Sequence, residues 1–117
     1  MQIDIRGVET VLTKEVKEYA REKVDKFAKY GLDIIRVELA LEEDHNRTED
    51  RAGVAKVLVK IPGKDIAAKG EGKNVFAAID EMERKASREL RENKKRFSPR
   101  ERLSKSKDTI RRLFRRG

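Results

Sequence analysis

Two stretches of the chain alternate between apolar and polar residues, and this alternation is the strongest constraint on the fold. In residues 34–42 and 52–61, apolar side chains recur at every second position. A period of two is the repeat of a β-strand with one buried and one solvated face. The side chains expected to face the core are Ile35, Val37, Leu39, Leu41, Ala55, Val57, Val59 and Ile61. The chain is therefore expected to build a sheet that is covered on one side only.

Further strands are expected before and after these two. Residues 2–7 alternate in the same way, which predicts a short strand near the N-terminus. Pro62-Gly63 fits a type II turn, because proline presets the first central residue and glycine accepts the positive φ of the second. The chain should then return as a shorter strand over residues 64–69, and the next two glycines should open a loop.

Two helices are predicted from apolar residues that recur at spacings of three and four. Thr13 can cap the first helix, which should run to about Lys29 and end at Gly31. Asn74 can cap the second, which should stop near Pro99 because the residue before a proline disfavours helix. The apolar stripes are Leu12, Val16, Ala20, Val24 and Phe27 in the first helix, and Val75, Ile79, Met82, Ala86, Leu90 and Phe97 in the second.

The predicted order is β-α-β-β-β-α, which is an α+β domain over residues 1–97 followed by a basic tail at 98–117. Strands two to four can form an antiparallel meander, and a right-handed crossover places strand one parallel to its neighbour. We expect a four-stranded mixed sheet with both helices packed on one face, superficially like a double-stranded-RNA-binding domain. The tail is expected to be disordered or a marginal helix.

The positive charge of the chain is concentrated near its C-terminal end. The net charge is +8, but residues 1–83 hold 15 basic and 18 acidic side chains, a net of −3. Residues 84–117 hold 15 basic and 4 acidic side chains, a net of +11. A highly charged, solvated surface explains the amount of charge but not this separation of sign. The separation favours a polyanionic partner, with nucleic acid ahead of an anionic membrane.

The second predicted helix carries the clearest candidate binding surface. Residues 84–96 contain seven bases and two acids, and four of the bases fall within a narrow arc opposite the apolar stripe. A solvated helix face usually mixes signs to gain ion pairs one turn apart, so an unpaired cationic ridge favours phosphate binding over mere solvation. The candidate RNA-binding residues of this helix are Arg84, Lys85, Arg88, Arg91, Lys94, Lys95 and Arg96.

The tail adds four arginines to the candidate set, namely Arg111, Arg112, Arg115 and Arg116. A generic disordered basic terminus and a membrane-surface segment are the alternatives for this region. Aromatic residues total six, all Phe or Tyr, and several lie on core or core-edge positions. Stacking on unpaired bases is therefore not expected to be the main mode, and recognition of folded RNA through shape and phosphates fits better.

Several function classes have no support in the sequence. Cysteine is absent, His45 stands alone among flexible acids, and the Gly-Lys-Ser/Thr ending of a phosphate-binding loop is missing. We therefore expect no catalytic residues, no metal, no cofactor and no small-molecule substrate. The N-terminus is unlike a signal peptide, and no apolar run is long enough to cross a membrane. We expect a cytoplasmic protein that does not bind membranes.

Three features together resemble a known family. They are the strand start Met1-Gln2-Ile3-Asp4-Ile5, the order of the elements, and the segment Asn74-Val75-Phe76-Ala77-Ala78-Ile79-Asp80. They resemble the short form of the ribosome hibernation promoting factor / ribosome-associated inhibitor family, also called sigma-54 modulation proteins. That family's second helix typically opens Asp-Met-Tyr-Ala-Ala-Ile-Asp and continues with spaced Lys, Arg and Leu. The spacing of Lys23, Lys26 and Tyr30 in the first helix matches as well.

The resemblance implies binding to the small ribosomal subunit between head and body, near the decoding centre. Basic residues of both helices, including Lys23 and Lys26, would contact 16S rRNA. The body of the protein would overlap the path of mRNA and of the A- and P-site tRNAs, so that translation is blocked by steric occupancy in stress. A general structured-RNA-binding protein or RNA chaperone, not specific to ribosomes, is the alternative.

The sequence departs from the family pattern in two respects, and these limit what the resemblance implies for this chain. Asn74 stands where Asp is usual and Phe76 where Tyr is usual, which keeps the cap but removes a hydroxyl. The long form carries a second domain that pairs ribosomes, and residues 100–117 are too few for one. We therefore expect a monomer off the ribosome.

Three lysines have a simpler explanation than RNA binding. On the helical wheel Lys23 lies near the apolar stripe, where its stem could simply cover core surface while the amine reaches water. Lys56 and Lys60 point outward from the third predicted strand, and we expect them to be solvated charges on the sheet face.

Overall fold

The computed structural model describes the backbone of residues 1–96 and the side chains of residues 1–93. The elements follow the predicted order, with two short 3-10 helices added. They are β1 (Gln2–Arg6), α1 (Lys14–Asp25), η1 (Lys26–Tyr30), β2 (Arg36–Glu43), η2 (Glu49–Arg51), β3 (Gly53–Ile61), β4 (Lys64–Gly72) and α2 (Val75–Arg96). The predicted tail at 98–117 and Phe97 lie outside the described residues.

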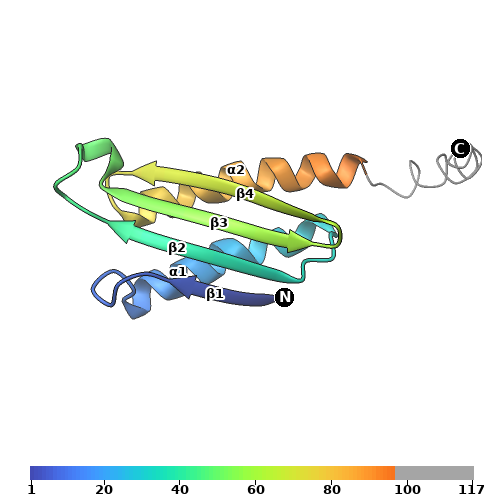
Figure 1. The fold of residues 1–117 in the computed structure, drawn as a ribbon, viewed down its shortest axis with the longest axis horizontal. Helices are drawn as coiled ribbons and strands as arrows, with labels where there is room; N and C mark the ends of the chain where they lie inside the picture. Colours follow the sequence, from blue (N-terminus) through green and yellow to red (C-terminus); the bar gives the residue numbers. More distant parts are fainter. Residues whose placement is uncertain (97–117) are drawn as a thin grey trace, which may run out of the picture.

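The sheet has four strands in the order β1-β2-β3-β4 and is mixed, as predicted. β1 pairs parallel with β2, and β2, β3 and β4 form an antiparallel meander. Both α-helices lie on the same face of the sheet and run in the same direction, antiparallel to β2 and β4 (Figure 1). The opposite face of the sheet is left uncovered, and we call it the open face.

The core lies between the sheet and the two helices. The predicted stripe of α2 is placed there, because Val75, Ile79, Met82, Ala86 and Leu90 are all buried. One strand residue was assigned wrongly. Ile35 is 57% exposed, whereas its neighbour Ile34 is 9% exposed and joins the core. The reason is that β2 begins only at Arg36, so the alternation does not yet apply to Ile35.

The first helix is shorter than its apolar stripe suggested. The Thr13 side chain accepts a hydrogen bond from the Val16 backbone N–H at 3.2 Å, which confirms the predicted cap. The α-helix ends at Asp25, and the chain continues as the 3-10 helix η1 to Tyr30. Gly31 ends this segment with a φ of 70°, the left-handed conformation expected of it.

β4 is longer than predicted, because Gly70 and Gly72 belong to the strand and do not open a loop. A Cβ atom on Gly70 would lie 2.3 Å from both the Ala78 carbonyl oxygen and the Met82 backbone nitrogen. The glycine therefore lets α2 lie directly on the strand. Close approach, and not turn formation, is what this residue provides.

Candidate nucleic-acid interface

The exposed face of α2 presents three arginines. Arg84, Arg88 and Arg91 are exposed, on the side of the helix away from its buried stripe. Within residues 1–93, no carboxylate forms an ion pair with any of them. The helix is held on the sheet by its apolar side, so the guanidinium groups are presented on a rigid support. Guanidinium groups bind phosphate oxygens in a bidentate manner.

The remaining cations predicted for this region fall into two groups. Lys85 is exposed but lies 3.8 Å from the Glu81 carboxylate one turn earlier, on the flank of the helix. Lys94, Lys95 and Arg96 lie on the helical backbone, and their side chains are outside the described residues. Also outside the described residues are Arg111, Arg112, Arg115 and Arg116. In the described part of the chain, the cationic ridge of α2 therefore consists of the three arginines.

The two candidates near α1 differ in their surroundings. Lys26 is the first residue of η1 and is exposed. Lys23 has a side chain only 20% exposed, with its ammonium 3.5 Å from Asp80 and 5.2 Å from the centre of the Tyr19 ring. Burial alone would lower the pKa of Lys23, but the neighbouring Tyr19 and Asp80 raise it above its ordinary value. Lys23 thus holds the two helices together in this structure.

A polar and aromatic cluster joins α1 to α2. The Tyr19 hydroxyl donates a hydrogen bond to Asp80, and its ring meets Phe76 edge-on, with the ring centres 5.2 Å apart. The hydrogen bond to Asp80, together with burial, raises the pKa of Tyr19. Tyr19 is partly buried and packs against the core, whereas Phe76 is 37% exposed and is not part of it. The cluster links the two helices side by side.

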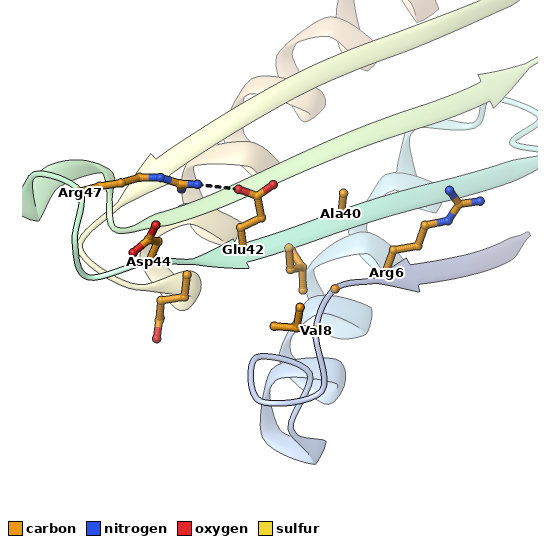
Figure 2. A pocket seen from close by; sticks show the side chains of 9 residues that line it. Arg6, Val8, Ala40, Glu42, Asp44 and Arg47 are labelled. Carbon is orange, nitrogen blue, oxygen red and sulfur yellow. Dashed lines mark hydrogen bonds and ion pairs between the residues drawn. The ribbon is translucent and has the colours of Figure 1, made fainter.

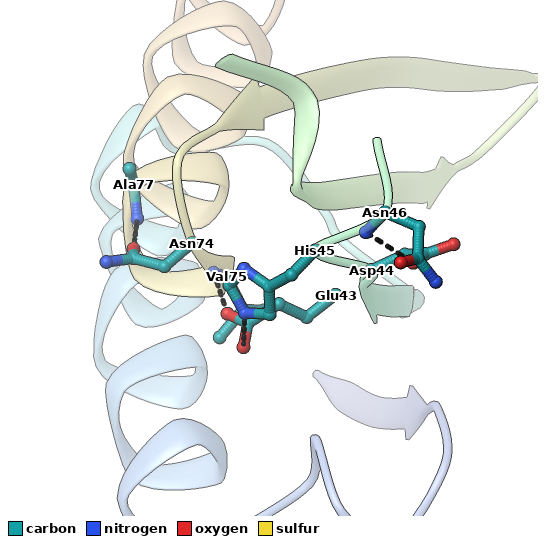
Figure 3. A network of polar contacts seen from close by, with 7 residues as sticks. All are labelled: Glu43, Asp44, His45, Asn46, Asn74, Val75 and Ala77. Carbon is teal, nitrogen blue, oxygen red and sulfur yellow. Dashed lines mark hydrogen bonds and ion pairs between the residues drawn. The ribbon is translucent and has the colours of Figure 1, made fainter. Parts of the chain in front are cut away.

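The N-terminus of α2 is held by two side chains, of which only one was predicted (Figure 3). The Asn74 side-chain oxygen accepts from the Ala77 N–H at 2.9 Å, which confirms the cap. The Glu43 carboxylate accepts from the Val75 N–H at 2.7 Å and also lies 3.2 Å from the His45 ring. Sequence reasoning missed Glu43, because it lies on β2, far away in the chain. Its carboxylate already occupies the place at which an anion could have bound.

A second group of cations lies on the open face and was not predicted as a group. The strand register aligns Arg6, Ala40, Lys56 and Lys69 across the sheet. No signal in the sequence indicates this row, because it depends on the register of three strand pairs. Lys60, by contrast, lies 3.8 Å from Glu38, as a paired surface charge.

The described residues, 1–96, also bear on other kinds of site. No group of three or more His, Cys, Asp or Glu side chains is arranged there to hold a metal ion. No helix in that part combines the length and the apolar character that crossing a membrane requires.

Comparison with known proteins gives a consistent result. Residues 3–98 match the family model described as Sigma 54 modulation protein / S30EA ribosomal protein. Curated relatives include a ribosome hibernation promoting factor of Pseudomonas putida, which is 26% identical over 94 residues, covering 80% of this chain and 87% of that protein. A protein of the same name from Acinetobacter guillouiae is 24% identical over 100 residues, covering 81% and 88%.

Two solved structures share the fold. The Thermus thermophilus Protein Y N-terminal domain superposes with a TM-score of 0.61 at 17% identity, covering 79% of this chain and 94% of that one. A ribosomal subunit interface protein from Coxiella burnetii superposes with a TM-score of 0.62 at 17% identity, covering 80% and 96%. At this identity the two structures support the fold alone.

Proposed function

The chain belongs to the Sigma 54 modulation protein / S30EA ribosomal protein family, and we propose from this that it is a ribosome hibernation factor. The names of its curated relatives support the proposal, since both are called ribosome hibernation promoting factors. Its partner would be the small ribosomal subunit, bound through 16S rRNA. The protein would act in the cytoplasm, and off the ribosome it would be a monomer.

The observation that carries the proposal is the unpaired arginine face of α2. Three exposed guanidinium groups on one rigid helix, with no ion-pair partner among residues 1–93, retain their full capacity for phosphate. Phosphate binding positions a protein on RNA without reading its sequence, and a folded rRNA surface offers many phosphates. Lys26 and the cations at 94–96 and 111–116 would extend the same surface.

The proposed mechanism is occupancy and needs no chemical step. Bound near the decoding centre, the domain would fill space that mRNA and the A- and P-site tRNAs need. Translation would stop while the protein is bound and resume when it leaves. The fold suits this role, because the helices are tied to the sheet and to each other and form a solid body.

The test is sedimentation of the protein with purified small subunits and with intact ribosomes. We expect stable binding that falls when mRNA and tRNA are supplied in excess, because they would compete for the same space. A short RNA duplex added instead should compete poorly. If the duplex binds the protein as tightly as ribosomes do, the chain is a general structured-RNA-binding protein or an RNA chaperone.

A further inference from the structure

A row of cations crosses the open face of the sheet, on the side away from α2. The register places Arg6 of β1 opposite Ala40 of β2, Ala40 opposite Lys56 of β3, and Lys56 opposite Lys69 of β4. Arg6, Lys56 and Lys69 are all exposed. Like charges directly opposite each other on neighbouring strands destabilise a sheet, so the Lys56–Lys69 pair has a cost that the fold itself does not require.

The acids around the row are engaged with other cations. Arg36 pairs with Asp4, Lys60 lies 3.8 Å from Glu38, and Arg47 lies 2.8 Å from Glu42. The hydrogen bond from Arg47, ahead of smaller contributions that include the charges of Lys56 and Lys69, lowers the pKa of Glu42.

One member of the row also has an acidic neighbour, since Lys69 lies 3.7 Å from Glu71. Arg6 and Lys56 have no ion-pair partner in the part of the chain whose side chains are described. Glu71 and Glu42 offset part of this charge, but within residues 1–93 Arg6 and Lys56 keep no ion pair of their own, so the row remains positively charged.

A hollow of about 460 Å³ adjoins the row where β1 ends and β2 continues. Figure 2 shows Arg6 and Arg47 on opposite sides of it, with Ala40 and Glu42 between them. Its lining includes Val8, which is 64% exposed, and the small residue Ala40, together with the three acidic residues Glu42, Glu43 and Asp44. Three carboxylates disfavour an anionic phosphate inside the hollow, so the row of cations, and not the hollow, is the surface that fits a phosphate backbone.

We propose that the open face binds a second RNA strand, with its phosphates along Arg6, Lys56 and Lys69. The inference rests on the proposed function and deepens it, since the domain would then be held between two RNA segments. One segment would lie on the arginines of α2 and the other on the opposite face. A domain that binds RNA on both of its faces could occupy the space that mRNA and the tRNAs need near the decoding centre.

The first test removes the charge of the row. In the variant Arg6→Gln/Lys56→Gln/Lys69→Gln, we expect affinity for small subunits to fall on the order of tenfold. The salt dependence should become shallower, by roughly 0.7 in log–log slope for each single-strand phosphate that is no longer neutralised. The matched control is Lys14→Gln/Lys17→Gln/Lys64→Gln, which removes the same charge from exposed positions away from the row. Equal affinities of the two variants would overturn the proposal.

The second test locates the RNA. The chain has no cysteine, so single cysteines can be labelled with a photocrosslinker without side reactions. We expect Ala40→Cys to crosslink to rRNA on small subunits, and Glu92→Cys on α2 to crosslink to a different rRNA segment. Lys64→Cys, at the β3–β4 turn, should give little crosslinking to rRNA.

The crosslinking pattern separates the two proposals. Crosslinks from position 92 alone, or crosslinks to a ribosomal protein from position 40, would overturn the second RNA site and leave the function intact. A wild-type protein that does not sediment with ribosomes would overturn the function itself.

Discussion

The Tyr19 hydroxyl donates a 2.5 Å hydrogen bond to the carboxylate of Asp80, joining α1 to α2 across 61 residues of sequence. Lys23 approaches the same carboxylate at 3.5 Å, one turn further along α1. These two contacts link the helices laterally, in addition to the packing of both helices in the core. The bridge therefore ties α1 to α2 through side chains.

Removal of the Tyr19 hydroxyl should weaken that bridge. We expect Tyr19→Phe to lower the free energy of unfolding by about 0.5–1.5 kcal/mol, since the ring still packs on Phe76 but the hydrogen bond is absent. Urea unfolding measures the change, and a double-mutant cycle with Asp80→Asn isolates the pair. Additive effects of the two substitutions would show that the hydrogen bond contributes nothing.

The same hydrogen bond predicts a dependence on pH. The folded-state pKa of Tyr19 is raised above its ordinary value of 10.0, mainly by the hydrogen bond to Asp80. The stabilisation is thus complete below that value and disappears as the pH rises through the higher folded-state pKa. We expect the stability difference between wild type and Tyr19→Phe to be constant at neutral pH and to shrink in strong alkali. A difference that grows with pH would contradict this sign.

Gly70 should not tolerate a side chain. An added Cβ would lie 2.3 Å from the backbone of α2, so Gly70→Ala must push the helix away from β4. We expect a decrease of about 1–3 kcal/mol in the free energy of unfolding, as for other overpacked cores. The control Ala67→Ser, at an exposed position on the same strand, should stay within about 0.5 kcal/mol of wild type. Equal stabilities of the two variants would show that the backbone of α2 does not lie directly on β4 at Gly70.

Glu43 should stabilise the start of α2. Its carboxylate accepts the Val75 N–H at 2.7 Å, so we expect Glu43→Gln to cost about 1 kcal/mol, through a weaker hydrogen bond and the removal of charge at a helix N-terminus. Hydrogen exchange of the first turn of α2 reports the effect locally. His45→Ala is the neighbouring control, because the His45 side chain is 72% exposed and should change little. A larger effect at His45 than at Glu43 would contradict this assignment.

The sequence predicted those features that depend on local periodicity. The stripe of α2, the caps at Thr13 and Asn74, and the order of the strands all follow from spacing or from side-chain chemistry nearby in the chain. The prediction for Ile35 failed because alternation does not show where a strand begins. The prediction for Gly70 failed because a glycine that allows close approach looks the same in the sequence as one in a loop.

The parts of the site that could not be predicted involve residues far apart in sequence. Glu43 at the start of α2 and Asp80 beside Tyr19 depend on how the elements pack. The alignment of Lys56 with Lys69 depends on the register of β3 against β4. The exposed arginines of α2 were predictable, because a helix fixes which residues share a face.

Equilibrium binding to purified small subunits over a range of salt concentrations shows whether the arginine face of α2 binds ribosomal RNA. We predict that Arg84→Gln/Arg88→Gln/Arg91→Gln binds on the order of tenfold or more weakly, with a log–log salt slope shallower by roughly 0.9 for each duplex phosphate that is no longer neutralised. Lys14→Gln/Lys17→Gln/Lys64→Gln should retain wild-type affinity. Wild-type affinity and an unchanged salt slope in a folded α2 variant would show that the arginine face does not bind ribosomal RNA.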